Sequence, residues 1–198
     1  MFNINFLHKE SVNDDKFISV EGHPIRLIIG LGNPGEKYKN TYHNVGFMFL
    51  GSILNDKKGD DYGEAPKWKS VKNFRYIKLA MVTLVKPTSF MNKSGEQVKS
   101  ALKYFNVPEK EILVVHDDAD IAFGNHKISF GRGSAGHKGI ESIIQALGTN
   151  EFLRVRIGIR TDSKKAGKFV LEKMTEGHRA DLEKVFAEIQ RKLFSSSA

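Results

Sequence analysis

Short apolar segments rich in β-branched residues alternate along this sequence with segments of helical periodicity. The segments "IRLIIG" (25–30) and "EILVVHDD" (111–118) are typical of buried strands. Between them, the segment 41–56 repeats apolar residues such as Val45 and Phe49 at the spacing of a helix. Strands that alternate with helices predict an α/β fold, in which helices flank one twisted sheet. We expect a single-domain three-layer sandwich around a mixed, mostly parallel sheet.

Further patterns predict other elements of this fold. The segment "FLRVRIGIR" (152–160) alternates arginine with apolar residues, which predicts a half-exposed strand. Ser94-Gly95-Glu96-Gln97 has the form of a capping box at the start of a helix. The acidic residues around position 118 predict a loop that leaves the preceding strand. The segment 73–87 predicts either one strand or two strands, which could form a hairpin. The remaining expected elements are a short strand, a helix with a glycine stop and a C-terminal amphipathic helix, at residues 126–130, 140–148 and 175–194.

Length and composition limit the class of protein. The chain has 198 residues and is 40% hydrophobic, so one domain with a substantial core is expected. Residues 1–24 are interpreted as a polar N-terminal extension of unknown role, or a short added strand, and residues 25–198 as the main domain. No cysteine is present, which excludes disulfides and thiolate zinc sites. No apolar run approaches the ~18 residues of a membrane span, and no signal peptide pattern is found, so a cytoplasmic protein without membrane contact is expected.

The charge of the chain indicates a class of partner. The formal net charge is +8 and the sequence pI is about 9.5. This excess of positive charge favours an anionic partner, with nucleic acid first and an acidic membrane surface second. A basic protein that is merely soluble is the alternative interpretation.

The first strand runs into the segment "GLGNPG" (30–35), which matches the G-x-G-x-x-G pattern of dinucleotide-binding proteins. Such a site also needs a helix that starts in the loop and a second strand with an acidic end about 20 residues on. Residues 36–40 have no apolar face, and no second strand is expected before residue 71, so a nucleotide-dependent enzyme is disfavoured. The P-loop pattern is also absent. We expect a tight turn that places Asn33 at the rim of a cleft, with His43 close by.

Polar side chains gather at the expected ends of strands and helices. In an open α/β sheet, residues at such positions converge on one crevice. A histidine beside a buried carboxylate can act as a general base, and asparagine amides can bind a carbonyl or its oxyanion. Each residue also has an ordinary interpretation as a turn, a helix cap or part of the core. These polar residues are Asn33, Tyr38, His43, Asn92, His116, Asp117, Asp118, His137 and Lys138.

A metal site is the main alternative, because His116, Asp117, Asp118 and Asp120 are close in sequence. Alternate side chains of a strand face opposite ways, and neither H-E-x-x-H nor a cysteine ligand is present, so we predict no metal. No G-x-S-x-G segment offers a serine nucleophile. Water activated by histidine is therefore the simplest hydrolytic chemistry that the sequence supports.

Four segments together resemble bacterial-type peptidyl-tRNA hydrolase in their order and spacing. They are "IIGLGNPGEKYKNTYHNVGF", "LVKPTSFMNKSG", "ILVVHDDADIAFG" and "GRGSAGHKGIESI". The resemblance covers residues from about 25 to 190 and implies that residues 25–198 form a catalytic domain. It implies an esterase that hydrolyses the bond between the C-terminus of a peptide and the 3′-terminal ribose of tRNA. It also implies histidine-activated water, no metal or cofactor, and a monomer with no obligate protein partner.

The resemblance assigns roles to individual residues. His43 matches the catalytic base, Asp117 the carboxylate that supports it, and Asn33 the amide that distinguishes blocked from free aminoacyl groups. Asn92 matches a residue that positions the water or the carbonyl. His137 lies in the glycine-rich lid of the family. The positions that match substrate-binding residues are Tyr38, Phe90, Met91, Asn92, His137 and Lys138.

Lys138 departs from the family, which typically has asparagine after the lid histidine. A cation that only donates hydrogen bonds replaces an amide that both donates and accepts. Asp118 and Ala119 also stand where glutamate and leucine are commoner. An RNA-binding module that has lost catalysis is therefore an alternative, although the retention of His43 and Asp117 argues against it.

Basic residues near the expected cleft are candidates for contacts with tRNA phosphates. Contacts of this kind make affinity fall as the salt concentration rises. Aromatic side chains suit the single-stranded acceptor end, whose bases can stack on them. Each cation also has the ordinary interpretation of a residue on a solvated strand face. The candidate phosphate contacts are Lys127, Arg132, Arg154, Arg156 and Lys164.

Overall fold

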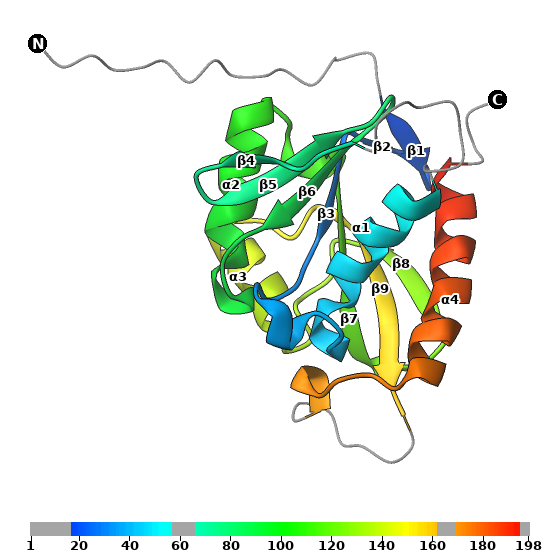
Figure 1. Cartoon of the computed structure of the whole chain (residues 1–198). Helices are drawn as coiled ribbons and strands as arrows, with labels where there is room; N and C mark the ends of the chain where they lie inside the picture. The colour runs from blue at the N-terminus through cyan, green and yellow to red at the C-terminus, as the bar shows by residue number, and fades with distance from the viewer. Residues whose placement is uncertain (1–16, 57–65, 162–168, 195–198) are drawn as a thin grey trace, which may run out of the picture.

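The computed structural model describes residues 17–56, 66–161 and 169–194 (Figure 1). Its centre is a seven-stranded sheet in the order β4-β5-β6-β3-β7-β9-β8. Strands β6, β3, β7 and β9 form a parallel centre, and the pairings β4–β5, β5–β6 and β8–β9 are antiparallel. The strand bounds are β3 Leu27–Gly30, β4 Lys69–Val71, β5 Phe74–Lys78, β6 Thr83–Pro87, β7 Ile112–Ala122, β8 His126–Phe130 and β9 Leu153–Arg160.

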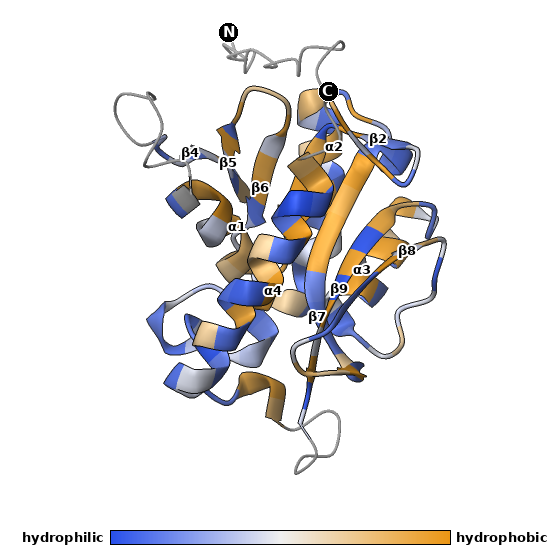
Figure 2. Ribbon diagram, turned by 90° about the vertical axis from the view of Figure 1, so that its right-hand side faces the viewer, coloured by the Kyte–Doolittle hydropathy of each residue, from blue (hydrophilic) through white to orange (hydrophobic). Residues whose placement is uncertain are grey.

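Helices cover both faces of this sheet. Alternate side chains of β3 point to opposite faces, so Ile28 packs with α1 and α4, whereas Leu27 and Ile29 pack with α2 and α3. Figure 2 shows the apolar strands of the sheet behind α4, whose outer side is largely hydrophilic. These layers confirm the predicted three-layer α/β sandwich. The helix bounds are α1 Val45–Asp56, α2 Ser94–Phe105, α3 Lys138–Leu147 and α4 Glu176–Phe194.

A small hairpin precedes the main sheet. Strands β1 (Ile18–Val20) and β2 (His23–Ile25) pair with each other and form a separate two-stranded sheet. Their buried side chains join the core between the main sheet and α4. The expected single strand over residues 25–30 is therefore divided, because Ile25 ends β2 and the parallel strand begins at Leu27. The proposed division of the chain at residue 24 stays a prediction.

Of the alternatives for residues 73–87, the structure shows the hairpin, formed by β5 and β6. The strand predicted over residues 126–130 is confirmed as β8. The glycine stop after α3 is also confirmed, because Gly148 adopts the left-handed conformation at the end of that helix. Within the described residues, no helix is both long enough and apolar enough to span a membrane.

Three expectations about local structure are wrong. Ser94 does not cap α2, because the short helix η4 (Met91–Lys93) leads directly into α2 and buries this serine. The acidic residues after Asp118 do not form a loop, because β7 continues to Ala122 alongside β9 with a shift in register. Strand β9 is not half-exposed, because it lies between β7 and β8.

Candidate active site

The candidate active site lies at the end of β3, beside the middle of β7, and where two helices begin. His43 lies in the short helix η2 (Tyr42–Asn44), which leads directly into α1. A Cβ atom at Gly46 would overlap the backbone of Leu31 and Val115, so α1 can approach both strands closely only because this residue is glycine. This close packing holds His43 over the middle of β7, next to Asp117.

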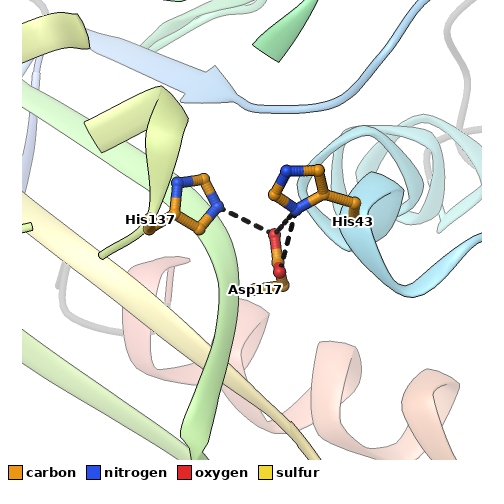
Figure 3. Close-up of side chains that lie close together, drawn as sticks. All are labelled: His43, Asp117 and His137. Carbon is orange, nitrogen blue, oxygen red and sulfur yellow. Dashed lines mark hydrogen bonds and ion pairs between the residues drawn. The ribbon is translucent and has the colours of Figure 1, made fainter. Parts of the chain in front are cut away.

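Two histidines share one buried carboxylate (Figure 3). The Nδ1 atom of His43 lies 2.9 Å from Oδ1 and 3.0 Å from Oδ2 of Asp117. The Nε2 atom of His137 lies 2.9 Å from the same Oδ1 atom. The structure therefore brings His43 and Asp117 together as the sequence predicted, and it adds His137 to them.

The hydrogen bonds determine where the protons of the two rings lie. His137 caps α3, and its Nδ1 atom accepts the backbone N–H groups of Gly139 and Ile140 at 3.1 and 3.2 Å. This nitrogen therefore carries no proton, and the Nε2–H group of His137 donates to Asp117. His43 donates to the carboxylate through Nδ1–H, which leaves the lone pair of its Nε2 atom free, on the side of the ring away from Asp117 (Figure 3).

Electrostatics keep the central carboxylate ionised. Burial by itself raises the pKa of Asp117, but His137 and His43 outweigh it through their charge and their hydrogen bonds. The pKa of Asp117 is therefore well below its usual range. A carboxylate that stays charged can fix the tautomer of a histidine and stabilise its protonated form.

Three potential metal-ligand atoms also meet in this site. One atom each of His43, Asp117 and His137 lies within 4.8 Å of the others. This is not the group that the sequence suggested, because Asp118 accepts from Arg156 and from the backbone N–H of Asp120 instead. The sequence analysis did not predict the contact between His137 and Asp117, because a glycine-rich segment gives no indication of the direction of its histidine side chain.

His116 lies next to the site but makes different contacts. Its Nδ1–H group donates to the backbone carbonyl of Asp117 at 2.7 Å, and its ring packs edge-on against that of His137. Burial is the largest of the effects that lower the pKa of His116 well below its usual value. This histidine is therefore neutral within the core.

Hydrogen bonds hold both the backbone and the side chain of Asn33. Its backbone N–H donates to Oδ1 of Asn44 at 2.8 Å, and the Nδ2 of Asn44 donates to the Asn33 carbonyl at 3.0 Å. The side-chain Oδ1 of Asn33 accepts the N–H of Met91 at 2.9 Å. Its NH2 group therefore has no partner within the described residues. Asn44 was missed by the sequence interpretation, although it directly follows His43.

The residues predicted to bind substrate take different positions. Phe90 is 51% exposed, and its ring meets that of Tyr38 edge-on at 6.2 Å between centroids. Asn92 is exposed, and its side chain makes no hydrogen bond within the part of the chain that the structure describes, whereas Met91 is buried. The Nζ atom of Lys138 forms an exposed ion pair with Glu141 at 3.0 Å. The binding roles of these residues stay predictions.

The candidate phosphate contacts are not equivalent. Arg154 is only 1% exposed, and its guanidinium donates to the carbonyl of Gly133 at 3.0 Å. Arg156 donates to the carboxylate of Asp118 at 2.7 Å. Lys127 and Arg132 are exposed, and Lys164 lies outside the described residues. The exposed pair is therefore accessible to a large anion in this structure, whereas Arg154 is not.

The fold and the site together define an α/β enzyme with a histidine–carboxylate centre at the carboxyl edge of its parallel strands. The chain belongs to the peptidyl-tRNA hydrolase family, whose sequence profile matches residues 27–197. The resemblance seen in the sequence is thereby confirmed, and the chain is a hydrolase of this family.

Individual relatives show the same similarity. The chain is 42% identical over 160 residues to the peptidyl-tRNA hydrolase of Mycobacterium avium, with 79% of this chain and 82% of the relative covered. It is 40% identical over 158 residues to that of Mycolicibacterium smegmatis, with the same coverage of 79% and 82%. The solved peptidyl-tRNA hydrolase of Acinetobacter baumannii matches with a TM-score of 0.71 at 28% identity, over 85% of this chain and 92% of that chain.

Proposed function

We propose that this protein hydrolyses the ester bond between the C-terminus of a peptide and the 3′-terminal ribose of tRNA. The observation that carries the proposal is the hydrogen bond from His43 to Asp117, which leaves Nε2 of His43 available as a base. Membership of the peptidyl-tRNA hydrolase family supplies the substrate class. Free tRNA and free peptide are the products.

His43 is proposed to activate the attacking water. Its Nε2 atom takes a proton from water while the oxygen attacks the ester carbonyl, and Asp117 stabilises the imidazolium that forms. The tetrahedral intermediate then collapses, the bond to the ribose oxygen breaks, and His43 returns the proton to that oxygen. The exposed amide of Asn92 is proposed to donate to the oxyanion.

Asn33 is proposed to bind the peptide next to the ester. Its side-chain NH2 is an unused donor, because the oxygen of the same amide is occupied by the backbone of Met91. A donor here suits the carbonyl of a preceding peptide bond, whereas the charged amine of a free aminoacyl group would be disfavoured. Aminoacyl-tRNA would therefore be spared.

The mechanism is proposed to need no metal. A metal ligand must offer a lone pair, but Nε2 of His137 carries a proton as long as its Nδ1 atom accepts two backbone N–H groups. Coordination through His137 would therefore break the cap of α3. The arrangement of the three side chains suits a hydrogen-bonded triad better than a metal site.

The remaining contacts are proposed from the resemblance. Phe90 and Tyr38 would stack on the terminal adenosine, with Met91 beneath them, and His137 and Lys138 would close over it. The phosphates of tRNA would contact basic side chains, first the exposed Lys127 and Arg132. Arg156 and Lys164 would add to these contacts, and Arg154 would do so after its side chain changes conformation. We also propose that residues 25–198 act as one catalytic domain, as a monomer in the cytoplasm.

The test is the release of peptide from a peptidyl-tRNA, with and without a chelator. We expect His43→Ala to lose activity and the wild-type rate to be indifferent to the chelator. The matched control is His126→Ala, which removes a histidine on β8 and should leave the rate unchanged. Loss of wild-type activity with chelator would exclude the metal-free mechanism. Tight tRNA binding without hydrolysis would instead favour the RNA-binding module.

A further inference from the structure

A cleft of about 870 Å³ lies beside the candidate active site, on the face of the sheet that α1 covers. Asn33 and Asn44 line this cleft, whereas His43 and Asp117 do not. Gly51 of α1 also lines the cleft, and a Cβ atom at this position would meet only open space. The cleft is therefore next to the catalytic groups but separate from them.

Two positive charges face each other across the strands at the wall of this cleft. Arg75 in β5 is directly opposite Lys86 in β6, and both line the cleft. Like charges directly opposite one another destabilise a pair of strands. Neither side chain forms an ion pair or a hydrogen bond with the described residues. Burial, and to a lesser extent Arg75, lowers the pKa of Lys86.

A second like-charged pair has a carboxylate that offsets the contact. Lys127 in β8 is directly opposite Arg156 in β9, but Arg156 donates to the carboxylate of Asp118 at 2.7 Å. Lys86 instead has the ring of Phe47, whose centroid lies 4.2 Å from Nζ. A ring stabilises a cation without neutralising it. The two charges at the cleft are therefore suited to binding an anion.

The other side chains of the cleft favour a peptide over a nucleic acid. Asparagine amides line it, and the unused NH2 group of Asn33 is a donor that suits a carbonyl of a peptide backbone. Three carboxylates line it as well, and two of them pair with cations of the same cleft, Glu36 with Lys39 and Glu176 with Arg179. The lining is therefore of mixed charge, and its carboxylates would repel a backbone with a phosphate on every nucleotide. A peptide with one acidic side chain avoids most of this repulsion. The three carboxylates belong to Glu36, Glu176 and Glu183.

The order of the strands separates the candidate phosphate contacts from the cleft. The exposed candidate phosphate contacts lie on and after β8, at one edge of the sheet, and the cleft lies against β5 and β6 on the other side of β7. Asp117 lies between them on β7. If tRNA approaches over β8, the peptide leaves the ester on the side of the cleft.

We propose that this cleft binds the peptide part of peptidyl-tRNA, and that Arg75 and Lys86 bind an acidic side chain of that peptide. The inference rests on the proposed function, because it assigns a subsite to the same substrate. It predicts that the enzyme prefers peptides that carry glutamate or aspartate a few residues before the ester.

The test uses two series of peptidyl-tRNAs that share one tRNA and one peptide length. One peptide series carries a single glutamate, moved residue by residue away from the ester, and the other carries glutamine at the same positions. For one glutamate position we expect kcat/KM to exceed that of the glutamine substrate by about tenfold, as for a partly buried charged hydrogen bond. Arg75→Gln and Lys86→Gln should each reduce this ratio, and Lys110→Gln, an exposed charge on η5 (Glu109–Glu111), should not.

The outcomes separate this inference from the proposed function. Equal rates for the glutamate and glutamine series would overturn the inference and leave the hydrolase intact. A proportional loss for every substrate in Arg75→Gln, including tRNA with only a blocked single amino acid, would indicate a contact with RNA and would also overturn it. Failure of the wild type on every substrate would overturn the proposed function alone, because binding can be measured separately.

That separate measurement uses free peptides with amidated C-termini. A fluorescently labelled hexapeptide that contains glutamate should bind the full chain more tightly than its glutamine counterpart, and Lys86→Gln should remove the difference. Equal affinity of the two peptides would overturn the inference without any reference to hydrolysis. The thermal unfolding of both variants serves as a folding control, and removal of a like-charge contact should leave the unfolding temperature unchanged or raise it.

Discussion

Asp117 accepts hydrogen bonds from two histidines, and each bond has a different consequence. The bond from His43 leaves a basic nitrogen on the outer side of the ring, whereas the bond from His137 ties the start of α3 to the same carboxylate. One buried charge therefore holds the proposed base and also fixes the segment that precedes α3.

We predict that the substitution Asp117→Asn causes a large loss of activity. The new NH2 group would face a ring N–H of one histidine, so His43 would lose the tautomer that leaves Nε2 free. We expect kcat to fall by about 10³- to 10⁴-fold, as when the orienting carboxylate of a triad is replaced by an amide, with a much smaller change in KM. Single-turnover hydrolysis measures the effect, and a normal circular dichroism spectrum shows that the variant is folded. A variant with near wild-type kcat would contradict the role given to the carboxylate.

The burial of neutral His116 predicts how the stability of the folded protein depends on pH. The folded protein keeps this histidine neutral, whereas an unfolded histidine binds a proton below pH about 6.5. The unfolded state therefore binds more protons as pH falls, and the folded state loses stability by roughly 1.4 kcal/mol per pH unit below that value. In His116→Leu, the free energy of unfolding between pH 7 and pH 5 should change less steeply. Parallel curves for both proteins would show that another group causes the slope.

Some residues of the site were predictable and others were not. The rule that polar residues at strand ends converge, together with the resemblance, is enough to select Asn33, His43 and Asp117 from the sequence. The hydrogen bond from His137 to Asp117 depends on which ring nitrogen of His137 accepts the backbone N–H groups at the start of α3. The burial of Arg154 depends on β8 covering a strand whose alternating pattern looks half-exposed. Both are properties of tertiary contacts.

At the scale of elements, the contact between α2 and α3 depends on a missing side chain. A Cβ atom at Gly95 would overlap the backbone of Ser142, and the Gly95 N–H donates to the hydroxyl of that serine at 3.0 Å. Helix α2 follows directly from the segment that carries Phe90 and Asn92. The distance between the two helices therefore affects the position of these proposed substrate contacts.

We predict that Gly95→Ala destabilises the protein, by about 1 to 3 kcal/mol, because two helix backbones must move apart. The matched control is Gly51→Ala in α1, where a Cβ meets open space and alanine should stabilise the helix by about 0.5 to 1 kcal/mol. Denaturant unfolding of both variants measures the two free energies. Equal effects of the two substitutions would show that helix propensity alone governs Gly95.

Local patterns predicted most elements but not how they are joined. Helix α4 and strand β8 follow from their own residues, whereas the residues of β5 and β6 left open whether they form one strand or two. The capping box at Ser94 failed because the preceding segment is also helical, so the helix begins without a cap at that residue. The continuation of β7 past Asp118 required β9 as a partner, which no local pattern contains.

At the scale of the whole molecule, the net charge of +8 predicts binding that weakens with salt. Glutamine in place of Lys127 or Arg132 should reduce the slope of log affinity against log salt by about 0.7 to 0.9, the value for one phosphate that is no longer neutralised. Lys110→Gln, on η5, removes the same charge and should leave the slope unchanged. Titration of tRNA at several salt concentrations measures these slopes. An equal change in all three variants would mean that net charge, and no particular side chain, attracts the tRNA.

The central position of β3 has a consequence for the newly made chain. This strand pairs with β6 on one side and β7 on the other, and both partners follow it in the sequence. During synthesis β3 therefore emerges with two open edges, which parallel partners close slowly because distant segments must meet. Until β7 emerges, His43 has no carboxylate beside it. A growing chain can therefore acquire the proposed activity only after most of its sheet has assembled.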